Sequence, residues 1–417
     1  MMKSNLKTAI KIALLSGAAM MATNATAYDK ELLDILLSNG SINQVQYDGL
    51  IGKVEKEDEV MKKMAWAGKI KIKGDLRLRH ETRSDSGAIL GSAAGPLEGE
   101  MKTFDKDRER YRMRLGIYAD VTENVQAGIR FASGDKFTPT STNETLRDHF
   151  AQDDLWIDLA YINWQPLEGL ELIGGKVKQP WEKISGGLVW DGDVNPEGAV
   201  LRYSHKLGGA ELIGSAGHYI LNDSGGKSFR EDQTITHGQF ASKFEVAGAK
   251  ALLGVSIYDY NQGRDKNGGI LALIYGGGND STKYSLKELF GSVSLKAPIP
   301  LKVYGQYVKN SDADGPHSGE NTAWLLGVGT KFGKWKFSYD YRDTELNAVY
   351  GVLNDSDFAD GLTGSKGSRL KASYKISKNF EVATAYFDAK VRRDSTNTDY
   401  TNNFDMDTWQ LDLKAKF

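Results

Sequence analysis

Hydrophobic and polar residues alternate one by one along most of this chain, from about residue 68 to its end. In the first such segment, Ile70, Ile72, Leu76 and Leu78 alternate with Lys71, Lys73, Asp75, Arg77 and Arg79. The same alternation recurs in 108–121, 125–131, 155–161, 334–342 and 369–376. A period of two residues predicts β-strands with one apolar face and one polar face.

The connections between these segments fall into two length classes. Short turns are expected at 122–124, 167–169, 207–209, 247–248, 298–300, 333 and 377–379. Long polar stretches lie between them, at 83–106, 136–153, 262–283 and 346–366. Counting strands between these connections gives about sixteen, with both ends of the set on the short-turn side, as in outer-membrane barrels.

We therefore predict that residues 67–417 form one all-β domain, a transmembrane antiparallel β-barrel of about 16 strands. A soluble β-sandwich would also alternate, but its connections would not sort into short and long. A soluble barrel of this size would expose a wide apolar band to water. In lipid the strands must close into a ring, because an open edge leaves backbone groups unpaired.

A short helical segment is expected ahead of the barrel, in residues 28–66. Leu32, Leu33, Ile35 and Leu36 predict one amphipathic helix that breaks at 39–40, and Ser41 is expected to cap a second helix. The segment is similar to a helix-turn-helix leader found ahead of some porin barrels. A periplasmic spacer and an oligomerising segment both remain possible roles for it.

The first 27 residues predict export. Lys3, Lys7 and Lys11 precede the apolar stretch 12–22, and Ala25-Thr26-Ala27 follows as a cleavage site. This pattern is typical of a signal peptide over 1–27. With the barrel, it predicts the bacterial outer membrane as the location and the periplasm for the helical segment.

The amino-acid composition limits the classes of molecule that the protein is expected to bind. The chain has no cysteine, a mean hydropathy of −0.44 and 26% charged residues, which fits a barrel in which only every second residue faces lipid. Without the three lysines of the signal, 50 basic residues stand against 55 acidic ones. This near balance argues against nucleic acid as a partner, because its phosphates require a basic surface.

No catalytic site, metal or cofactor is predicted. The six histidines are scattered, and the sequence has no G-x-S-x-G motif and no pair of histidines four residues apart. Asp191, Asp193 and Asn195 are spaced like the start of a calcium loop, but Pro196 and Arg202 stand where an EF-hand has Gly and Glu. Calcium in this loop stays a weaker alternative.

Three segments carry a resemblance to Gram-negative outer-membrane porins. They are WAGKIKIKGDLRLRHE at 66–81, RERYRMRLGI at 108–117 and GKVKQPWEKISGGLVWDGDVNPEG at 175–198. On these the chain is identified as a member of the family called putative porins. The resemblance implies a sixteen-stranded barrel, a homotrimer and diffusion of small hydrophilic solutes, and it names no preferred solute.

The end of the chain resembles the assembly signal of outer-membrane barrels. One face of the last predicted strand carries Trp409, Leu411, Leu413, Ala415 and Phe417. The resemblance implies that the barrel-assembly machinery recognises this strand ending in Phe417.

A basic wall is expected inside the barrel. If the apolar residues of the first strand face lipid, the residues between them face the lumen. The same argument applied to the neighbouring strands gives the predicted wall: Lys71, Lys73, Arg77, Arg79, Arg108, Arg110, Arg112, Arg114 and Arg130.

Acidic residues are expected opposite this wall. By resemblance, residues 179–196 form the loop that folds into the lumen of sixteen-stranded porins. The acids of the loop and of the strand that follows are Glu182, Asp191, Asp193 and Glu197. Facing a basic wall, they would create a transverse field at the narrowest point. Alternatively, the arginines pair with Asp75, Asp120 and loop carboxylates and stiffen the wall.

These features predict a porin, a water-filled channel for passive diffusion of small hydrophilic solutes and ions. Its expected partners are outer-membrane lipid, those solutes, further copies of itself and the assembly machinery. The alternative function is a structural or adhesive barrel, or a tether, without an open pore.

Overall fold

A computed structural model describes residues 30–53, 66–88, 102–135, 137–184, 186–223, 232–261, 279–296, 298–392 and 403–417. The expected signal peptide 1–27 lies outside these residues, as do parts of the long connections expected at 83–106 and 262–283. The chain divides into two compact units, 1–71 and 72–417, which are treated separately below.

The first unit contains the expected pair of helices, α2 (Lys30–Ser38) and helical residues 44–53, followed by the 3-10 turn η2 (Ala67–Lys69). The cap of the second helix is not Ser41 but Asn43. The Asn43 backbone N–H donates to Gln46 Oε1 at 3.0 Å, and the Gln46 N–H donates to Asn43 Oδ1 at 2.9 Å. This reciprocal capping box satisfies two N–H groups that a helix start leaves free. No helix in the described part of the chain is long and apolar enough to cross a bilayer.

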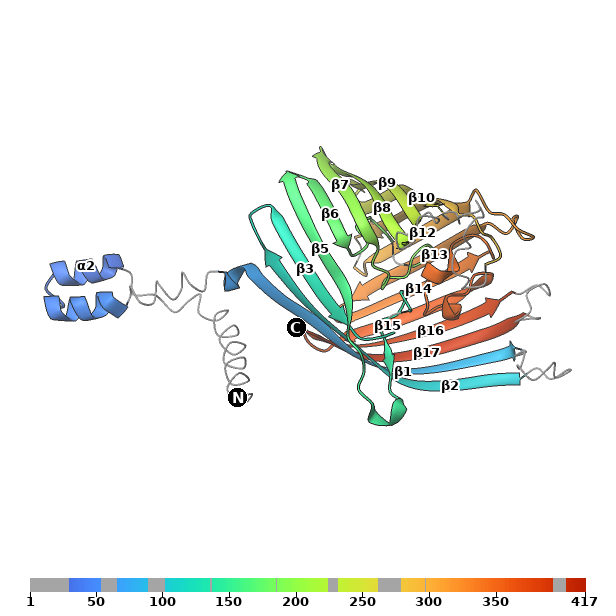
Figure 1. Cartoon of the computed structure of the whole chain (residues 1–417), viewed down its shortest axis with the longest axis horizontal. Helices are drawn as coiled ribbons and strands as arrows, with labels where there is room; N and C mark the ends of the chain where they lie inside the picture. Colours follow the sequence, from blue (N-terminus) through green and yellow to red (C-terminus); the bar gives the residue numbers. More distant parts are fainter. Residues whose placement is uncertain are drawn as a thin grey trace. The chain divides into compact units, whose positions relative to one another are not determined.

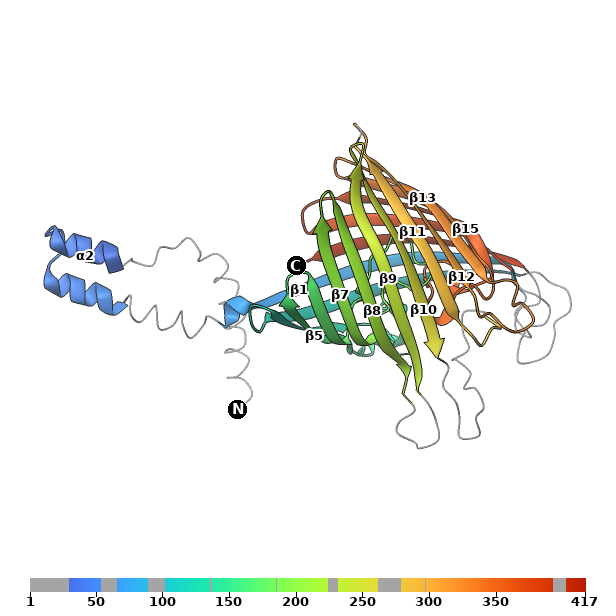
Figure 2. The ribbon, with the colours of Figure 1, turned by 90° about the horizontal axis from the view of Figure 1, so that it is seen from above.

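The second unit is a closed antiparallel barrel (Figures 1 and 2). Its strands are β1 (Ile70–Ala88), β2 (Lys102–Asp120), β3 (Val125–Ala132), β4 (Glu144–Thr145), β5 (Trp156–Leu167), β6 (Leu170–Lys176), β7 (Glu197–Leu207), β8 (Ala210–Asn222), β9 (Gln233–Val246), β10 (Ala249–Asn261), β11 (Ser285–Leu295), β12 (Leu301–Asn310), β13 (Thr322–Phe332), β14 (Trp335–Thr344), β15 (Ser365–Lys375), β16 (Phe380–Val391) and β17 (Phe404–Lys416). Since β4 is a two-residue strand beside β2, sixteen long strands of the described chain form the ring, which confirms the predicted fold.

Closure joins the two ends of the ring. Strand β17 pairs with β1 from Asp75↔Lys416 to Ser86↔Asp405. The Gly74 N–H donates to the Phe417 carbonyl at 2.9 Å, and the Phe417 N–H donates to the Gly74 carbonyl at 3.0 Å. The last residue of the chain therefore seals the ladder against the first strand.

The first two strands are longer than the sequence pattern indicated. A connection was expected at 83–106, yet β1 continues to Ala88 and β2 begins at Lys102. The ends of these strands are polar on both faces, because a strand that extends beyond the bilayer meets water on both sides. Alternation therefore marks only the part of a strand that faces lipid.

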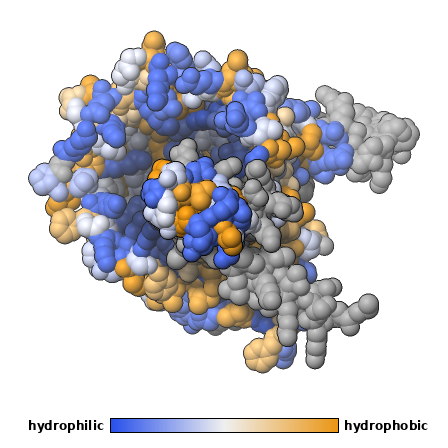
Figure 3. Space-filling model, turned by 90° about the vertical axis from the view of Figure 1, so that its left-hand side faces the viewer, coloured by the Kyte–Doolittle hydropathy of each residue, from blue (hydrophilic) through white to orange (hydrophobic). Residues whose placement is uncertain are grey.

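Large apolar side chains point outward along the barrel. More than a third of the surface of each is exposed for Leu76, Leu78, Ile117, Ile129, Leu253, Val255, Leu326, Leu370, Leu411 and Leu413. On β1 and β17 the residues between them are buried inside and polar, among them Arg77, Arg79, Gln410 and Asp412. From the short-turn end, hydrophilic residues surround a hollow in the barrel (Figure 3). An apolar outer band with a polar interior is the pattern of a barrel in lipid.

Glycines on the inner wall make room for aromatic rings. A Cβ atom at Gly254 would lie 2.3 Å from Cζ of Phe290, and one at Gly327 would lie 2.4 Å from the ring of Tyr304. Phe290 and Tyr304 are both almost completely buried. Each ring packs directly against the backbone of its glycine, in space that a side chain at that position would occupy.

We predict that Gly254→Ala destabilises the barrel by about 1–3 kcal/mol, because the buried Phe290 ring must move aside. The folded band on an unboiled gel should then convert to the unfolded band at a lower temperature than for the unsubstituted protein. The matched control is Gly214→Ala in β8, where an added Cβ meets no atom within 4 Å. Equal transition temperatures for the two variants would contradict this packing argument.

Candidate functional site

The segment between β6 and β7, residues 177–196, lies inside the barrel and packs on one side of the inner wall. Its apolar residues Trp181, Ile184, Leu188, Val189 and Trp190 are buried against inward side chains of β8 to β13. The Trp190 indole N–H donates to the Tyr260 hydroxyl at 3.2 Å, and the Glu182 N–H donates to Gln239 Oε1 at 2.7 Å. This side of the lumen is thus filled by a buried cluster of aliphatic and aromatic side chains.

A second inward segment, residues 345–364 between β14 and β15, meets the first. It contains the 3-10 turns η4 (Gly351–Leu353) and η5 (Ala359–Gly361). The Asp191 N–H donates to the Leu353 carbonyl at 2.7 Å, and the Ser356 N–H donates to Asp191 Oδ2 at 3.0 Å. The sequence pattern predicted only a long outer connection here, although the apolar run AVYGVL at 348–353 could have indicated burial.

A third segment enters the lumen where the chain leaves the sheet between β3 and β4. The Ser133 hydroxyl donates to the Thr142 carbonyl at 2.8 Å, which folds residues 133–142 back on themselves. The Ser356 hydroxyl donates to the Thr140 carbonyl at 2.9 Å. Three segments distant in sequence therefore meet at one level of the barrel.

The predicted basic wall lies beside these segments on β1 and β2. Arg112 and Arg114 share Asp75, at 2.7 and 2.8 Å, and Arg114 also reaches Asp193 of the first inward segment at 3.2 Å. Asp75 thus links two neighbouring guanidiniums on the wall. The contact of Arg114 with Asp193 links the wall to the inserted loop.

The other arginines of the wall are also paired. Arg79 bonds Asp412 at 2.7 Å and Asp357 at 2.9 Å, and Arg77 lies 3.9 Å from Asp412. The remaining pairs are Arg108 and Arg110 with Glu81, and Arg130 with Asp158. Every arginine of the predicted wall therefore has a carboxylate within 4 Å, so the wall carries alternating charges.

The two lysines of the predicted wall differ from its arginines. Lys71 and Lys73 are exposed and precede the first residue of β1 that pairs with β17. The Lys73 ammonium lies 5.8 Å from the centre of the Tyr118 ring, near the short-turn end.

The four predicted loop acids separate in space. Asp193 faces the basic wall through Arg114, whereas Glu182 points to the other side and pairs with Arg202 at 3.1 Å and Lys243 at 2.9 Å. Asp191 is buried between the two inward segments.

Glu197 does not belong to the lumen. It shares the outer face of β7 with Leu201 and Tyr203, both more than 40% exposed, and it pairs with Lys176 at 2.7 Å. Because side chains alternate along a strand, its position at the start of β7 directs it outward. The prediction that grouped it with the constriction acids is corrected here.

Sequence reasoning missed a second charged cluster, on β14 and β15. Arg342 and Arg369 are almost fully buried and both bond Asp355 of the second inward segment, at 3.3 and 3.0 Å. Arg369 also bonds Asp340 at 2.9 Å. The alternating pattern identified Asp340, Arg342 and Arg369 as polar strand residues. It could not predict their contact with Asp355, because Asp355 lies in a connection whose path has no periodic pattern.

The inward carboxylates differ in protonation. Burial and the neighbouring charges of Asp355 and Asp193 raise the pKa of Asp191 from its ordinary 3.8 to about 8. Burial also acts to raise the pKa of Asp357, but Arg79 and Arg77 outweigh it and hold that pKa below its ordinary range. At neutral pH Asp357 is therefore an anion, and Asp191 carries a proton for most of the time.

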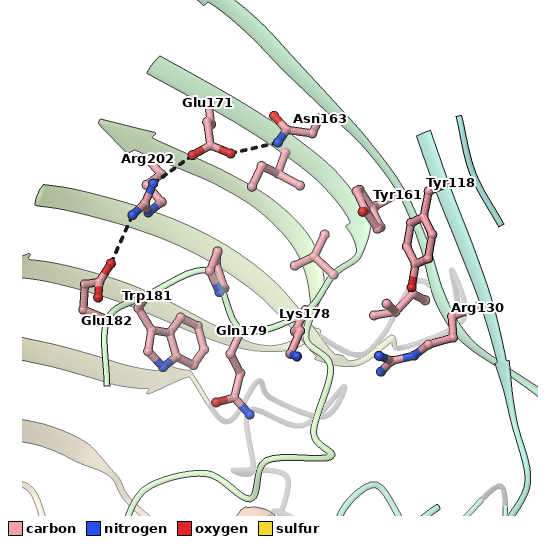
Figure 4. Close-up of a pocket in the computed structure, with 14 residues that line it drawn as sticks. Tyr118, Arg130, Tyr161, Asn163, Glu171, Lys178, Gln179, Trp181, Glu182 and Arg202 are labelled. Atoms are coloured by element: carbon pink, nitrogen blue, oxygen red, sulfur yellow. Dashed lines mark hydrogen bonds and ion pairs between the residues drawn. The ribbon is translucent and has the colours of Figure 1, made fainter. Parts of the chain in front are cut away.

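Cavities remain on both sides of this level. Toward the short-turn end, a cavity of about 450 Å³ is lined by Tyr118, Arg130, Tyr161, Lys178, Trp181 and Arg202, among others (Figure 4). Toward the long-loop end, a cavity of about 190 Å³ is lined by Arg83, Arg108, Arg110 and Asp360, among others. In the described part of the chain, no group of three or more His, Asp or Glu side chains is placed to hold a metal ion.

A closed sixteen-stranded barrel with a charged, loop-narrowed interior defines a channel-forming outer-membrane protein. The sequence model of the family described as "Putative porin" matches residues 44–273 and 302–417, and the chain belongs to this family. Family and fold together place it in the bacterial outer membrane as a porin.

Two solved structures are similar to this chain. OprB of Pseudomonas putida, in a structure at high pH, matches with a TM-score of 0.54 and 9% identity over 86% of this chain and 96% of its own. A triple mutant of the Rhodopseudomonas blastica porin matches with a TM-score of 0.44 and 10% identity over 84% of this chain and all of its own. A search of curated proteins found no match.

We predict that the contact between the first two inward segments weakens as pH rises. Asp191 holds a proton when the segments are packed and loses it more readily when they separate, so the packed state binds more protons. Its stability therefore falls between pH 3.8, the ordinary pKa, and about pH 8. The emission of Trp181 and Trp190 should therefore shift to longer wavelength as the pH rises toward about 8, with little further shift above it. In Asp191→Asn this shift should disappear, and an unchanged shift would contradict the assignment.

Proposed function

We propose that the chain forms a water-filled channel for passive diffusion of small hydrophilic solutes and ions, narrowed where the inward segments approach β1 and β2. One observation carries the proposal: ion pairs line this side of the lumen between two cavities, while the opposite side is dry and filled. Ion-paired side chains that face an open, water-accessible space can line a passage for hydrated solutes. The filled side leaves no room for a solute and can only support the inserted segment.

The ion pairs give the passage its selectivity. A solute beside β1 and β2 meets Arg112, Arg114 and Asp75 on the wall, and Asp193 on the inserted segment. Low-dielectric walls focus the field of these charges across the passage, and the field orients dipolar solutes. Pairing also fixes the arginine side chains, so the passage keeps its width.

A barrel that serves as a tether is the second candidate. The observation that favours it is the buried hydrophobic cluster around Trp181 and Trp190, which fills one side of the lumen. A tether would show no conductance in planar bilayers.

The first test is ion selectivity. Replacing Arg112 and Arg114 with Gln leaves Asp75 without its two guanidiniums, so the reversal potential in a salt gradient should shift toward cations. We expect a permeability ratio changed by about twofold or more. Asp193→Asn should shift it toward anions, because Arg114 loses a partner.

The controls use the same chemistry at other places. Glu197→Gln removes an outward carboxylate and should leave the reversal potential unchanged. At about pH 6, Asp191→Asn should also have little effect, because Asp191 is already protonated there. Selectivity that does not change in the Arg112 and Arg114 variant, with conductance intact, would mean that these pairs only stiffen the wall.

We further propose a homotrimer in the outer membrane, with the helical unit in the periplasm. The connection between β3 and β5 extends beyond the barrel wall (Figure 1), and Leu146 and Phe150 on it are more than 60% exposed. Exposed apolar side chains on a connection that projects from the wall suit a protein interface. Delivery to the barrel-assembly machinery through the strand that ends in Phe417 belongs to the same proposal.

The trimer has its own test. Replacing Leu146 and Phe150 with Ser should convert trimers to monomers in detergent, as measured by light scattering, without loss of the folded band. Leu207→Ser, at a short turn, is the matched control and should leave the trimer intact. A monomeric unsubstituted protein would overturn the proposal.

A further inference from the structure

The cavity at the short-turn end contains a cation that has no partner among the described residues. Lys178 is exposed to this cavity, and among the residues that the structure describes none pairs with its ammonium within 4 Å. The nearby carboxylates are engaged elsewhere: Asp158 binds Arg130 and Asn195, and Asp193 binds Arg114. A negative group that entered the cavity would therefore meet Lys178 without displacing a protein acid.

The acidic residues that line the cavity already have protein partners. Glu171 accepts from Arg202 at 2.8 Å and from Asn163 at 2.8 Å. Glu182 accepts from Arg202 and Lys243. These pairs nearly balance in charge, so the surplus charge of the cavity is that of Lys178. Figure 4 shows its ammonium and the guanidinium of Arg130 directed toward the same part of the cavity.

Two tyrosine rings lie beside these cations. Tyr118 lies over Gly116, and Tyr161 lies over Gly128, where an added Cβ would come within 2.7 Å of either ring. Glycine at both positions keeps the rings against the wall, so the opposite face of each is turned to the cavity. An exposed flat ring face suits contact with a flat ring of a solute.

We propose that this cavity is a binding site for small monocarboxylates that carry a flat ring, with the carboxylate at Lys178 and Arg130 and the ring against Tyr118 and Tyr161. The site rests on the proposed porin function, because it would concentrate such solutes on the short-turn side of the narrow passage. A volume of about 450 Å³ is in the range of pockets for small molecules.

Charge and ring act together in this site. Arginine matches the two oxygens of a carboxylate with two N–H groups, and lysine adds a point charge. Burial and the charges of Arg130 and Arg114 lower the pKa of Lys178, so an incoming anion relieves a repulsion between cations. A ring contributes apolar contact that acetate lacks.

The test measures block of the single-channel current by added anions in planar bilayers. Benzoate, glucuronate and acetate are compared at constant ionic strength, so that the first two distinguish an aromatic ring from a sugar ring. We expect a saturable block by benzoate, a weaker one by glucuronate, whose pyranose ring is not flat, and none by acetate. Lys178→Gln should raise the half-blocking concentration by about tenfold, the effect of one lost charge-assisted hydrogen bond.

Two further variants test whether the block depends on this cavity and on the tyrosine ring. Lys296→Gln removes an equally positive side chain at a short turn, away from this cavity, and should leave the block unchanged. Tyr161→Ala should reduce the block by benzoate toward the level of acetate. Folded bands on an unboiled gel verify that each variant has assembled.

The outcomes separate the two proposals. Open channels that benzoate does not block, or a block by benzoate that Lys178→Gln leaves unchanged, would overturn the binding site and leave the porin function standing. An absence of conductance in the unsubstituted protein would overturn the porin function itself.

Discussion

The requirement that every backbone N–H and carbonyl in lipid be hydrogen-bonded governs this structure. An open sheet would leave one row of such groups unpaired at each edge, at several kcal/mol for each group. The ladder therefore has to close, and it does so through β17 and β1, with Gly74 and Phe417 exchanging two hydrogen bonds. Closure fixes the side-chain phase of every strand at once, because a slip of one residue would exchange the lipid face and the lumen face.

Once the ring is closed, each part of its interior must either be filled by side chains or be exposed to water, and both occur in this barrel. On β8 to β13 the inward residues are largely aromatic and aliphatic, and they bury the apolar part of segment 177–196. On β1 and β2 the inward residues are charged, and each arginine has a carboxylate within reach. The dry side holds the inserted segment in place, and the wet side is left as the passage.

Charge pairing in the lumen has a physical limit. A charge taken out of water loses its hydration, and an ion pair recovers this only if its geometry is good. Asp75 and Asp357 satisfy this condition with two arginines nearby, and Asp357 stays ionised. Asp191 has no cation against it in the described contacts and lies beside Asp355 and Asp193, so it keeps its proton. The same residue type thus plays opposite roles within one constriction.

The sequence by itself determined the barrel, because alternation and turn lengths are local and lipid allows few structures to satisfy them. It also determined which arginines of β1 and β2 face inward, since a strand has only two faces. Only the tertiary structure decided their partners: Asp193, Asp355 and Asp357 lie in connections, whose path no period of side chains encodes. The second inward segment likewise depends on contacts between segments far apart in the chain. So does the position of Lys178, which has no carboxylate within 4 Å among the described residues.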